Sequence, residues 1–224
     1  MHTEVSFCAC RSSVYRDLAS CFYVPEDSGL RREFFEQLSE ALSGCCPAAV
    51  PFSDRMGAAL ADYSQEELSV AFAKLFVGPF GLGAPPYGSI YLDEGGRLMG
   101  DSTAEVLKLY REAGLSIAKD FKNLPDHIGA ELEFMYFLTY REREALEACD
   151  AEQVSLLRDR QKVFLHQFLA PWVDPFCAKV IDGTVNTYFR ALAHCVQVFV
   201  AHDDGRLGAR SEVVDPRATH VEQR

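Results

Sequence analysis

An uncharged stretch decides how this chain is interpreted: residues 75–92 have the sequence LFVGPFGLGAPPYGSIYL. Eighteen residues without a charge are long enough to cross a membrane as a helix. However, the stretch contains four glycines and three prolines, and both residue types oppose a continuous helix. We therefore predict a long loop between helices and no stable membrane insertion.

Long ordered loops in compact domains are uncommon and are often functional. One interpretation is that this loop folds its apolar side chains onto the core. The other is that proline and glycine hold Leu82, Tyr87 and Tyr91 in a partly open apolar surface. Such a surface could bind an extended or helical peptide at a modest cost in conformational entropy.

Outside the loop, apolar residues recur at helical spacing along nearly the whole chain. The clearest helix start is Ser64, which stands three residues before Glu67 and can form a capping box with it. Helices are expected at about residues 12–25, 28–44, 54–63, 64–76, 102–114, 125–149, 151–169, 171–181 and 185–201. No segment alternates apolar and polar residues convincingly over the length of a strand.

These patterns predict an all-α fold: one globular domain over residues 1–202, with about nine to ten helices and the long Pro/Gly-rich loop. The longest helix, from Pro125 to Cys149, is apolar on all sides in its first half, which is typical of a central, buried helix. Its second half, Arg141 to Glu147, is charged and is expected to be solvated. Residues 203–224 lack a periodic apolar face and are predicted to form a mobile C-terminal tail.

The charge balance limits the class of partner. The chain has 22 Lys and Arg residues and 33 Asp and Glu residues, so its net charge is −11. Such an acidic protein repels phosphate backbones, which argues against nucleic-acid binding. The same charge favours a cationic partner.

The eight cysteines give no clear metal motif. Cys8 and Cys10 form a CxC pair, Cys45 and Cys46 are adjacent, and no CxxC pair occurs at zinc-finger spacing. Most of the cysteines are expected to be small buried apolar residues. No secretory signal is visible in the first ten residues, so reduced thiols and a cytoplasmic location are predicted.

The sequence Leu124-Pro125-Asp126-His127 marks the start of the longest helix. Proline is favourable in a first helical turn, and the Asp126 carboxylate would complement the helix dipole there. His127 and Glu131 lie four residues apart on one helical face, so they could supply two metal ligands or an acid–base pair. The alternative for His127 is a structural hydrogen bond at the helix start.

Enzyme signatures are absent from the sequence. It contains neither a GxSxG nucleophile elbow nor a phosphate-binding GxxxxGK[ST] loop, and the glycines at 78, 81 and 83 do not form a dinucleotide motif. A metal- or nucleotide-dependent enzyme that uses Asp126, His127 and Glu131 remains one alternative. A scaffolding helical subunit of a larger complex is another.

The ordered set of motifs resembles the TorD/DmsD family of maturation chaperones for molybdenum enzymes, with the DmsD branch nearest. The resemblance is carried by residues 75–93, by GDST at 100–103, and by PDH with the acidic helix after it at 125–133. Weaker similarities are His166 with Pro171-Trp172, and YFRALA at 188–193. Tyr87 and Tyr91 stand where DmsD-like members often carry tryptophan, which leaves the client protein open.

The resemblance implies an all-helical, non-enzymatic cytoplasmic protein without a cofactor, a metal or catalytic residues. Such a protein binds the twin-arginine signal peptide of a molybdopterin oxidoreductase subunit. It assists cofactor loading and assembly of that catalytic subunit before export. Either a monomer or a domain-swapped dimer is compatible with the resemblance.

The resemblance also implies a peptide-binding groove. Its lining residues would be Leu75, Phe76, Pro86, Tyr87, Gly100, Asp126 and His127. The Asp126 carboxylate would pair with a peptide arginine, and Gly100 would permit a close backbone approach. We therefore expect the loop at 78–92 to pack against the helix that begins near Pro125.

Overall fold

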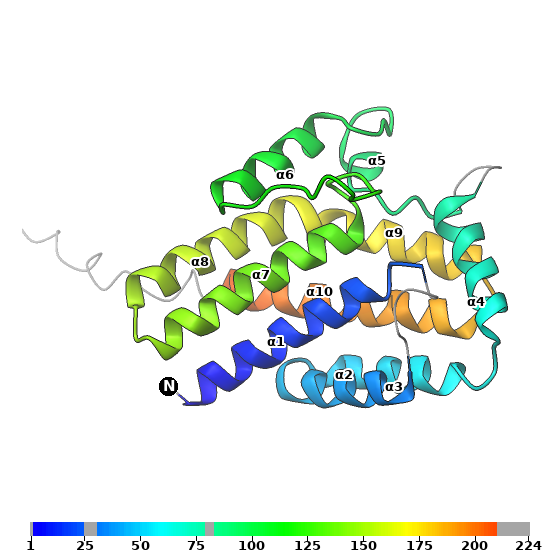
Figure 1. Ribbon diagram of the computed structural model, residues 1–224, viewed down its shortest axis with the longest axis horizontal. Helices are drawn as coiled ribbons and strands as arrows, with labels where there is room; N and C mark the ends of the chain where they lie inside the picture. The colour runs from blue at the N-terminus through cyan, green and yellow to red at the C-terminus, as the bar shows by residue number, and fades with distance from the viewer. Residues whose placement is uncertain (1, 25–30, 79–82, 210–224) are drawn as a thin grey trace, which may run out of the picture.

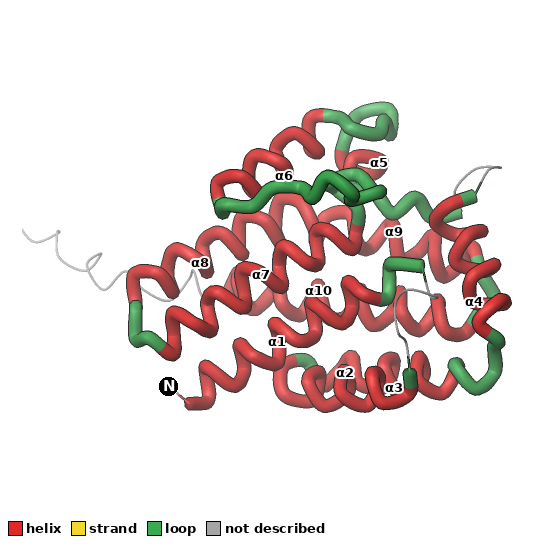
Figure 2. The backbone as a smooth tube through the Cα atoms, in the orientation of Figure 1, coloured by secondary structure: helices red, strands yellow, loops and turns green. Residues whose placement is uncertain are grey.

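The computed structural model describes residues 2–24, 31–78 and 83–209. Ten α-helices form this part of the chain, and it contains no β-strand, so the predicted all-α fold with nine to ten helices is confirmed (Figure 2). The helices are α1 His2–Ser20, α2 Arg32–Cys45, α3 Val50–Ala59, α4 Gln65–Phe72, α5 Ser89–Leu92, α6 Asp101–Glu112, α7 Ile128–Glu147, α8 Ala151–Phe164, α9 Ala170–Gly183 and α10 Thr187–Ala209. Within these ranges, no helix is both long and apolar enough to cross a membrane.

Local sequence signals explain where several helices begin. The Ser64 hydroxyl accepts a hydrogen bond from the Glu67 amide at 3.2 Å, and the Glu67 carboxylate accepts one from the Ser64 amide at 2.8 Å. This capping box starts α4, as predicted. The chain continues from α4 into a wide helical turn, Ala73–Val77, which ends where the Pro/Gly-rich loop begins.

The longest helices form the centre of the molecule (Figure 1). Helix α1 packs along α7 and α2, while α10 packs against α3 and α9. The first half of α7 is buried at Leu132, Met135 and Leu138, which confirms the predicted central helix. In Figure 1, α6 and the segment after it lie above α7 and α8, so this upper layer and the core enclose the region where the loop meets α7.

Two predictions about the chain's charged parts are corrected. Glu142, in the second half of α7, is buried and forms ion pairs with Arg11 of α1 and Arg158 of α8. Helix α10 continues to Ala209, so residues 203–209 are helical rather than part of a tail. This segment is helical because Asp203 is buried and forms an ion pair with Arg11, which anchors the end of α10 to the core. Residues 210–224 lie outside the described residues.

Candidate functional site

The Pro/Gly-rich loop packs against the start of α7, as predicted. The Ile128 amide donates a hydrogen bond to the Pro86 carbonyl at 2.9 Å, and the Gly88 amide donates one to the Asp126 carbonyl at 2.8 Å. These two bonds flank an isolated antiparallel bridge between Tyr87 and His127. The loop therefore adds a short, strand-like contact to an otherwise helical site. Leu82, which was expected in the same surface, lies outside the described residues.

His127 is the N-cap of α7. Its Nδ1 accepts a hydrogen bond from the Gly129 amide at 3.1 Å, which confirms the structural hydrogen bond predicted as one alternative. The imidazole lies between two tyrosine rings, stacked on Tyr23 at 6.1 Å and edge-on to Tyr87 at 5.5 Å between ring centroids. Burial lowers the pKa of His127 to about 4, so the ring is neutral at neutral pH.

Asp126 is buried and does not cap the helix. Only 1% of its surface is exposed, and its Oδ2 accepts a hydrogen bond from the Ser89 amide at 2.9 Å. Its Oδ1 has no hydrogen-bond partner. Asp126 turns toward the loop, and His127 caps the helix instead. A groove-lining position for the Asp126 carboxylate does not fit this burial.

Glu131 is also buried and engaged. Its exposure is 0%, and its Oε2 accepts a hydrogen bond from the Trp172 indole at 3.0 Å. Burial raises the pKa of the Glu131 carboxyl well above its ordinary value, and the nearby Asp126 raises it further. Among the described residues, no group of three or more His, Cys, Asp and Glu side chains could hold a metal ion. The arrangement therefore does not favour an enzyme built on His127, Glu131 and Asp126.

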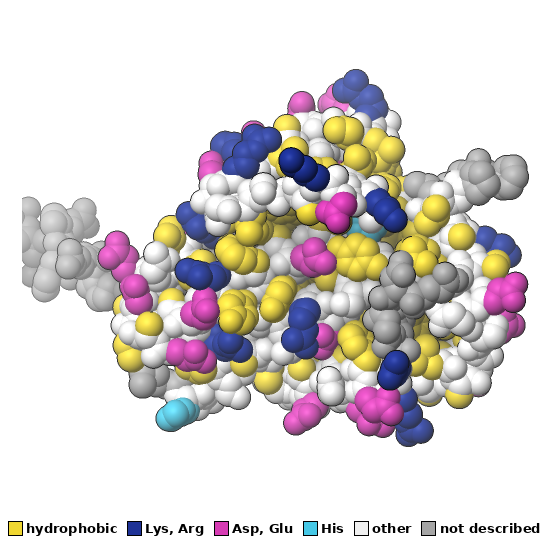
Figure 3. All heavy atoms as spheres, viewed as in Figure 1, with side chains coloured by type: hydrophobic (Ala, Val, Ile, Leu, Met, Phe, Trp, Pro, Cys, Tyr) yellow, Lys and Arg dark blue, Asp and Glu magenta, His cyan; other side chains and the backbone are white. Residues whose placement is uncertain are grey.

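A cavity of about 690 Å³ opens beside the capped end of α7. It brings together three of the predicted residues, Phe76, Tyr87 and His127. The full lining is Phe22, Tyr23, Val24, Phe72, Phe76, Val77, Tyr87, Leu98, Ala118, Asp120, Phe121, Lys122, Asn123 and His127. Figure 3 shows hydrophobic side chains gathered in a hollow between the upper layer and the α1–α7 pair. We call this space the main cavity.

The other predicted residues lie outside the lining of the main cavity. Leu75 is buried and lines a different hollow, next to Gly183. Pro86 is buried and anchors the loop through its carbonyl. Gly100 is the N-cap of α6, and a Cβ there would overlap the Asp93 carboxylate. The close approach at Gly100 is thus made by this chain itself, because Asp93 accepts hydrogen bonds from the Ser102 amide and hydroxyl at 3.1 and 3.0 Å.

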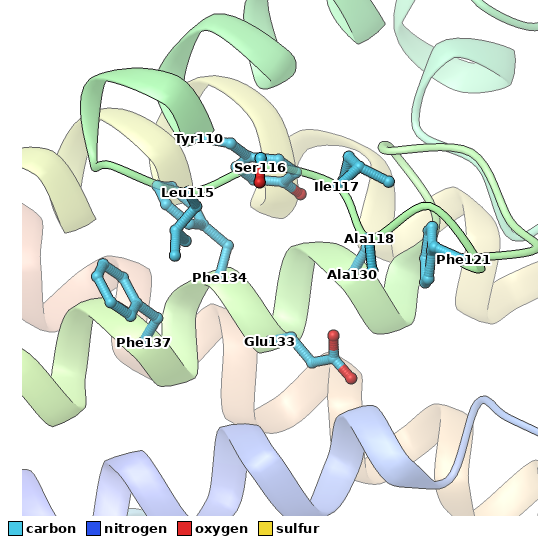
Figure 4. A pocket seen from close by; sticks show the side chains of 10 residues that line it. All are labelled: Tyr110, Leu115, Ser116, Ile117, Ala118, Phe121, Ala130, Glu133, Phe134 and Phe137. Carbon is cyan, nitrogen blue, oxygen red and sulfur yellow. The ribbon is translucent and has the colours of Figure 1, made fainter.

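A second cavity of about 310 Å³ adjoins the first along α7 (Figure 4). Its lining is Tyr110, Leu115, Ser116, Ile117, Ala118, Phe121, Ala130, Glu133, Phe134 and Phe137. Ala118 and Phe121 line both cavities, so the segment between α6 and α7 forms a shared wall. We call this space the side cavity.

The sequence analysis did not predict most of the residues that line the two cavities. Tyr23 follows the end of α1, and residues 115–123 connect two helices without a periodic apolar face. The one available signal was the apolar character of Leu115, Ile117 and Phe121 in a segment expected to be a connection. Tyr91, expected in the open surface, is half-buried and stacks on Trp172 with the ring centroids 5.5 Å apart.

Comparisons with known proteins agree with this fold and site. A family model described as "Nitrate reductase delta subunit" matches residues 26–178, which is more than half of the chain. The Tat proofreading chaperone DmsD of Salmonella typhimurium is 29% identical over 145 residues, which are 65% of this chain and 64% of that protein, slightly less than two thirds of its length. The chaperone protein TorD of Shewanella loihica is 27% identical over 217 residues, covering 89% of this chain and 93% of that protein.

A solved structure has the same fold. The crystal structure of a putative redox enzyme maturation protein from Archaeoglobus fulgidus aligns with a TM-score of 0.53 at 19% identity. The alignment covers 85% of this chain and 93% of the archaeal chain. Taken with the matched family model and with relatives of both the DmsD and TorD types, the chain belongs to the TorD/DmsD family of redox enzyme maturation proteins.

Proposed function

We propose that this protein is a cytoplasmic chaperone that binds the twin-arginine leader of a molybdopterin oxidoreductase subunit. It holds the client back from export while the cofactor is loaded and the subunit assembles. It acts by binding, without catalysing a reaction. The main cavity is the observation that carries the proposal, since it gathers apolar and aromatic side chains at the loop that defines the family resemblance.

The cavity suits the apolar part of such a leader. Phe76, Tyr87 and the neutral His127 ring form a largely uncharged wall. Apolar peptide side chains that are buried against it contribute about 25 cal/mol of binding free energy per Å² of apolar area removed from water. Leu75, Pro86, Gly100 and Asp126 are proposed to act indirectly, by fixing the loop and the start of α6. The name of the Salmonella relative supports a role in proofreading twin-arginine leaders.

The net charge of −11 suits the cationic part of the leader. Exposed acidic charge attracts a peptide headed by two arginines and speeds its association. This attraction should weaken as ionic strength rises, because the Debye length is about 8 Å at physiological salt. Stopped-flow association rates that stay constant from low to high salt would contradict this steering.

Titration calorimetry with the client's leader peptide tests the cavity. Tyr87→Ala is expected to weaken binding by about tenfold or more, because the peptide loses an aromatic wall. Tyr140→Ala is the matched control, since this half-buried tyrosine lies about 20 Å further along α7 at 1.5 Å per residue. Thermal melts of both variants verify folding. Equal affinities for the two variants would argue against the main cavity as the binding site.

A further inference from the structure

Three carboxylates stand at the start of α7, and they differ in access. Asp126 and Glu131 are buried and accept hydrogen bonds from the Ser89 amide and the Trp172 indole. Glu133 is exposed and lines the side cavity. Of the three, Glu133 alone can reach a bound peptide without a rearrangement of the loop.

Glu133 also marks the junction of the two cavities. Its Oε1 accepts a hydrogen bond at 2.8 Å from the hydroxyl of Tyr23, and Tyr23 lines the main cavity. In Figure 4 the Glu133 carboxylate projects from α7 toward α1, away from Tyr110 and Leu115. A ligand that extends from one cavity to the other would pass this carboxylate.

The surroundings of Glu133 fit a guanidinium group. A carboxylate provides two acceptor oxygens for the paired N–H donors of arginine, and the planar guanidinium stacks on aromatic rings. Among the described residues, no lysine or arginine forms an ion pair with Glu133. The other ionisable groups lining the two cavities are Tyr23, Tyr87, Tyr110, Asp120, Lys122 and His127. Asp120 adds attraction for a cation, and Lys122 opposes it.

We propose that Glu133, held in place by Tyr23, binds one arginine guanidinium of the leader, and that the side cavity accepts an apolar side chain close to that arginine. This inference rests on the proposed function and adds a residue and a subsite to it. It moves the arginine-binding role from Asp126, which is buried, to a carboxylate on the same helix that is open to a ligand.

The local electrostatics agree with this assignment. Loss of water around Glu133 raises the pKa of its carboxyl above the ordinary value, and the hydrogen bond from Tyr23 opposes that shift. A guanidinium would favour the charged form and lower the pKa again. Affinity for the leader should therefore be highest at neutral pH and should fall as the pH drops through the raised pKa of Glu133.

The experiment is a double-mutant cycle measured by titration calorimetry. Glu133→Gln removes the charge but keeps an oxygen that can accept the Tyr23 hydrogen bond, so the fold is preserved. Glu152→Gln, at an exposed position in the first turn of α8, is the control with the same charge change. Each protein is titrated with the twin-arginine leader and with two leaders that carry glutamine in place of the first or the second arginine.

We expect Glu133→Gln to weaken binding of the twin-arginine leader by about tenfold. The loss should disappear with one of the two glutamine leaders and persist with the other, which identifies the paired arginine. The fall in affinity at mildly acidic pH should be reduced in Glu133→Gln and retained in Glu152→Gln.

Two results would overturn the inference while leaving the proposed function intact. One is an equal affinity of the wild-type protein and of Glu133→Gln for the twin-arginine leader. The other is a loss that is the same for all three leaders. If the wild-type protein does not bind the twin-arginine leader at all, the proposed function fails and the assignment of Glu133 fails with it.

Discussion

Two regions of the described structure each bury a pair of carboxylates, and only one region supplies its pair with a cation. Where α1, α7, α8 and α10 meet, Arg11 donates to Asp203, Glu142 and Gln161 at distances of 2.7 to 3.2 Å. At the junction of the loop with α7, Asp126 and Glu131 are buried without a cationic partner. Each of these two carboxylates has one oxygen without a hydrogen bond.

The difference predicts opposite contributions to stability. Buried charge is costly unless it is paired and hydrogen-bonded, and breaking one partner of a buried pair leaves the other uncompensated. The Arg11 cluster should therefore stabilise the native state, and removal of any one of its charged side chains should lower the free energy of unfolding. The buried carboxylates at the loop junction should lower the free energy of unfolding, and replacing one of them with a neutral side chain should raise it.

The largest effect is expected for Arg11→Met. Arg11 is 1% exposed, so its removal leaves Asp203 and Glu142 buried with fewer partners. The free energy of unfolding should fall by about 3–5 kcal/mol in urea titrations. Arg32→Met is the control, because the exposed pair of Arg32 with Glu36 should contribute less than about 1 kcal/mol. Similar losses of unfolding free energy for the two variants would contradict the stabilising role of the buried Arg11 cluster.

A smaller loss is expected for Asp203→Asn. The Arg11 guanidinium is the main group that outweighs burial and lowers the pKa of Asp203 from 3.8 to about 2. Because the folded pKa is depressed, the stabilisation is present above 3.8 and is lost as the pH falls toward 2. The variant should thus be less stable by about 2 kcal/mol at neutral pH. The difference from wild type should shrink in this acid range, and a constant difference across it would contradict the ion pair.

Glu131→Gln should act in the opposite direction. Burial raises the folded pKa of Glu131, so wild-type stability declines as the pH rises above the ordinary value of 4.5. Glutamine can still accept the Trp172 hydrogen bond without this penalty. We expect a gain of about 1–2 kcal/mol at neutral pH that vanishes in acid, measured by chemical denaturation. A loss of stability at neutral pH would show that the junction is not destabilising.

The smallest effect is expected for Asp126→Asn. The amide oxygen of asparagine can still accept the Ser89 hydrogen bond, so stability should change by less than about 1 kcal/mol. Because asparagine keeps this contact with the loop, and the leader arginine is assigned to Glu133, both leader binding in calorimetry and the thermal melt should stay close to wild type. A loss of stability as large as that of Asp203→Asn would place Asp126 among the structural charges instead.

The sequence predicted only a minor part of the candidate site. Phe76, Tyr87 and His127 were expected from the motifs, and the structure brings them into one cavity. Tyr23 and Glu133 were not expected, because they come from the end of α1 and the open side of α7 and meet only when these helices pack. Leu75 and Gly100 belong to the same motifs, but they serve the core and the Asp93 contact.

Residues close together in the chain account for the all-α class, the capping box at Ser64 and the break in helix at the Pro/Gly-rich loop, so these features could be predicted from local spacing. The burial of Asp203 and Glu142, in contrast, results from the packing of distant helices. The pairing of Arg11 with Asp203 joins residues 192 positions apart, and a charged residue in a helical pattern looks solvated until its cation is placed beside it. Local periodicity reports which face of a helix is apolar, whereas the exceptions to it depend on distant partners that only packing brings into contact.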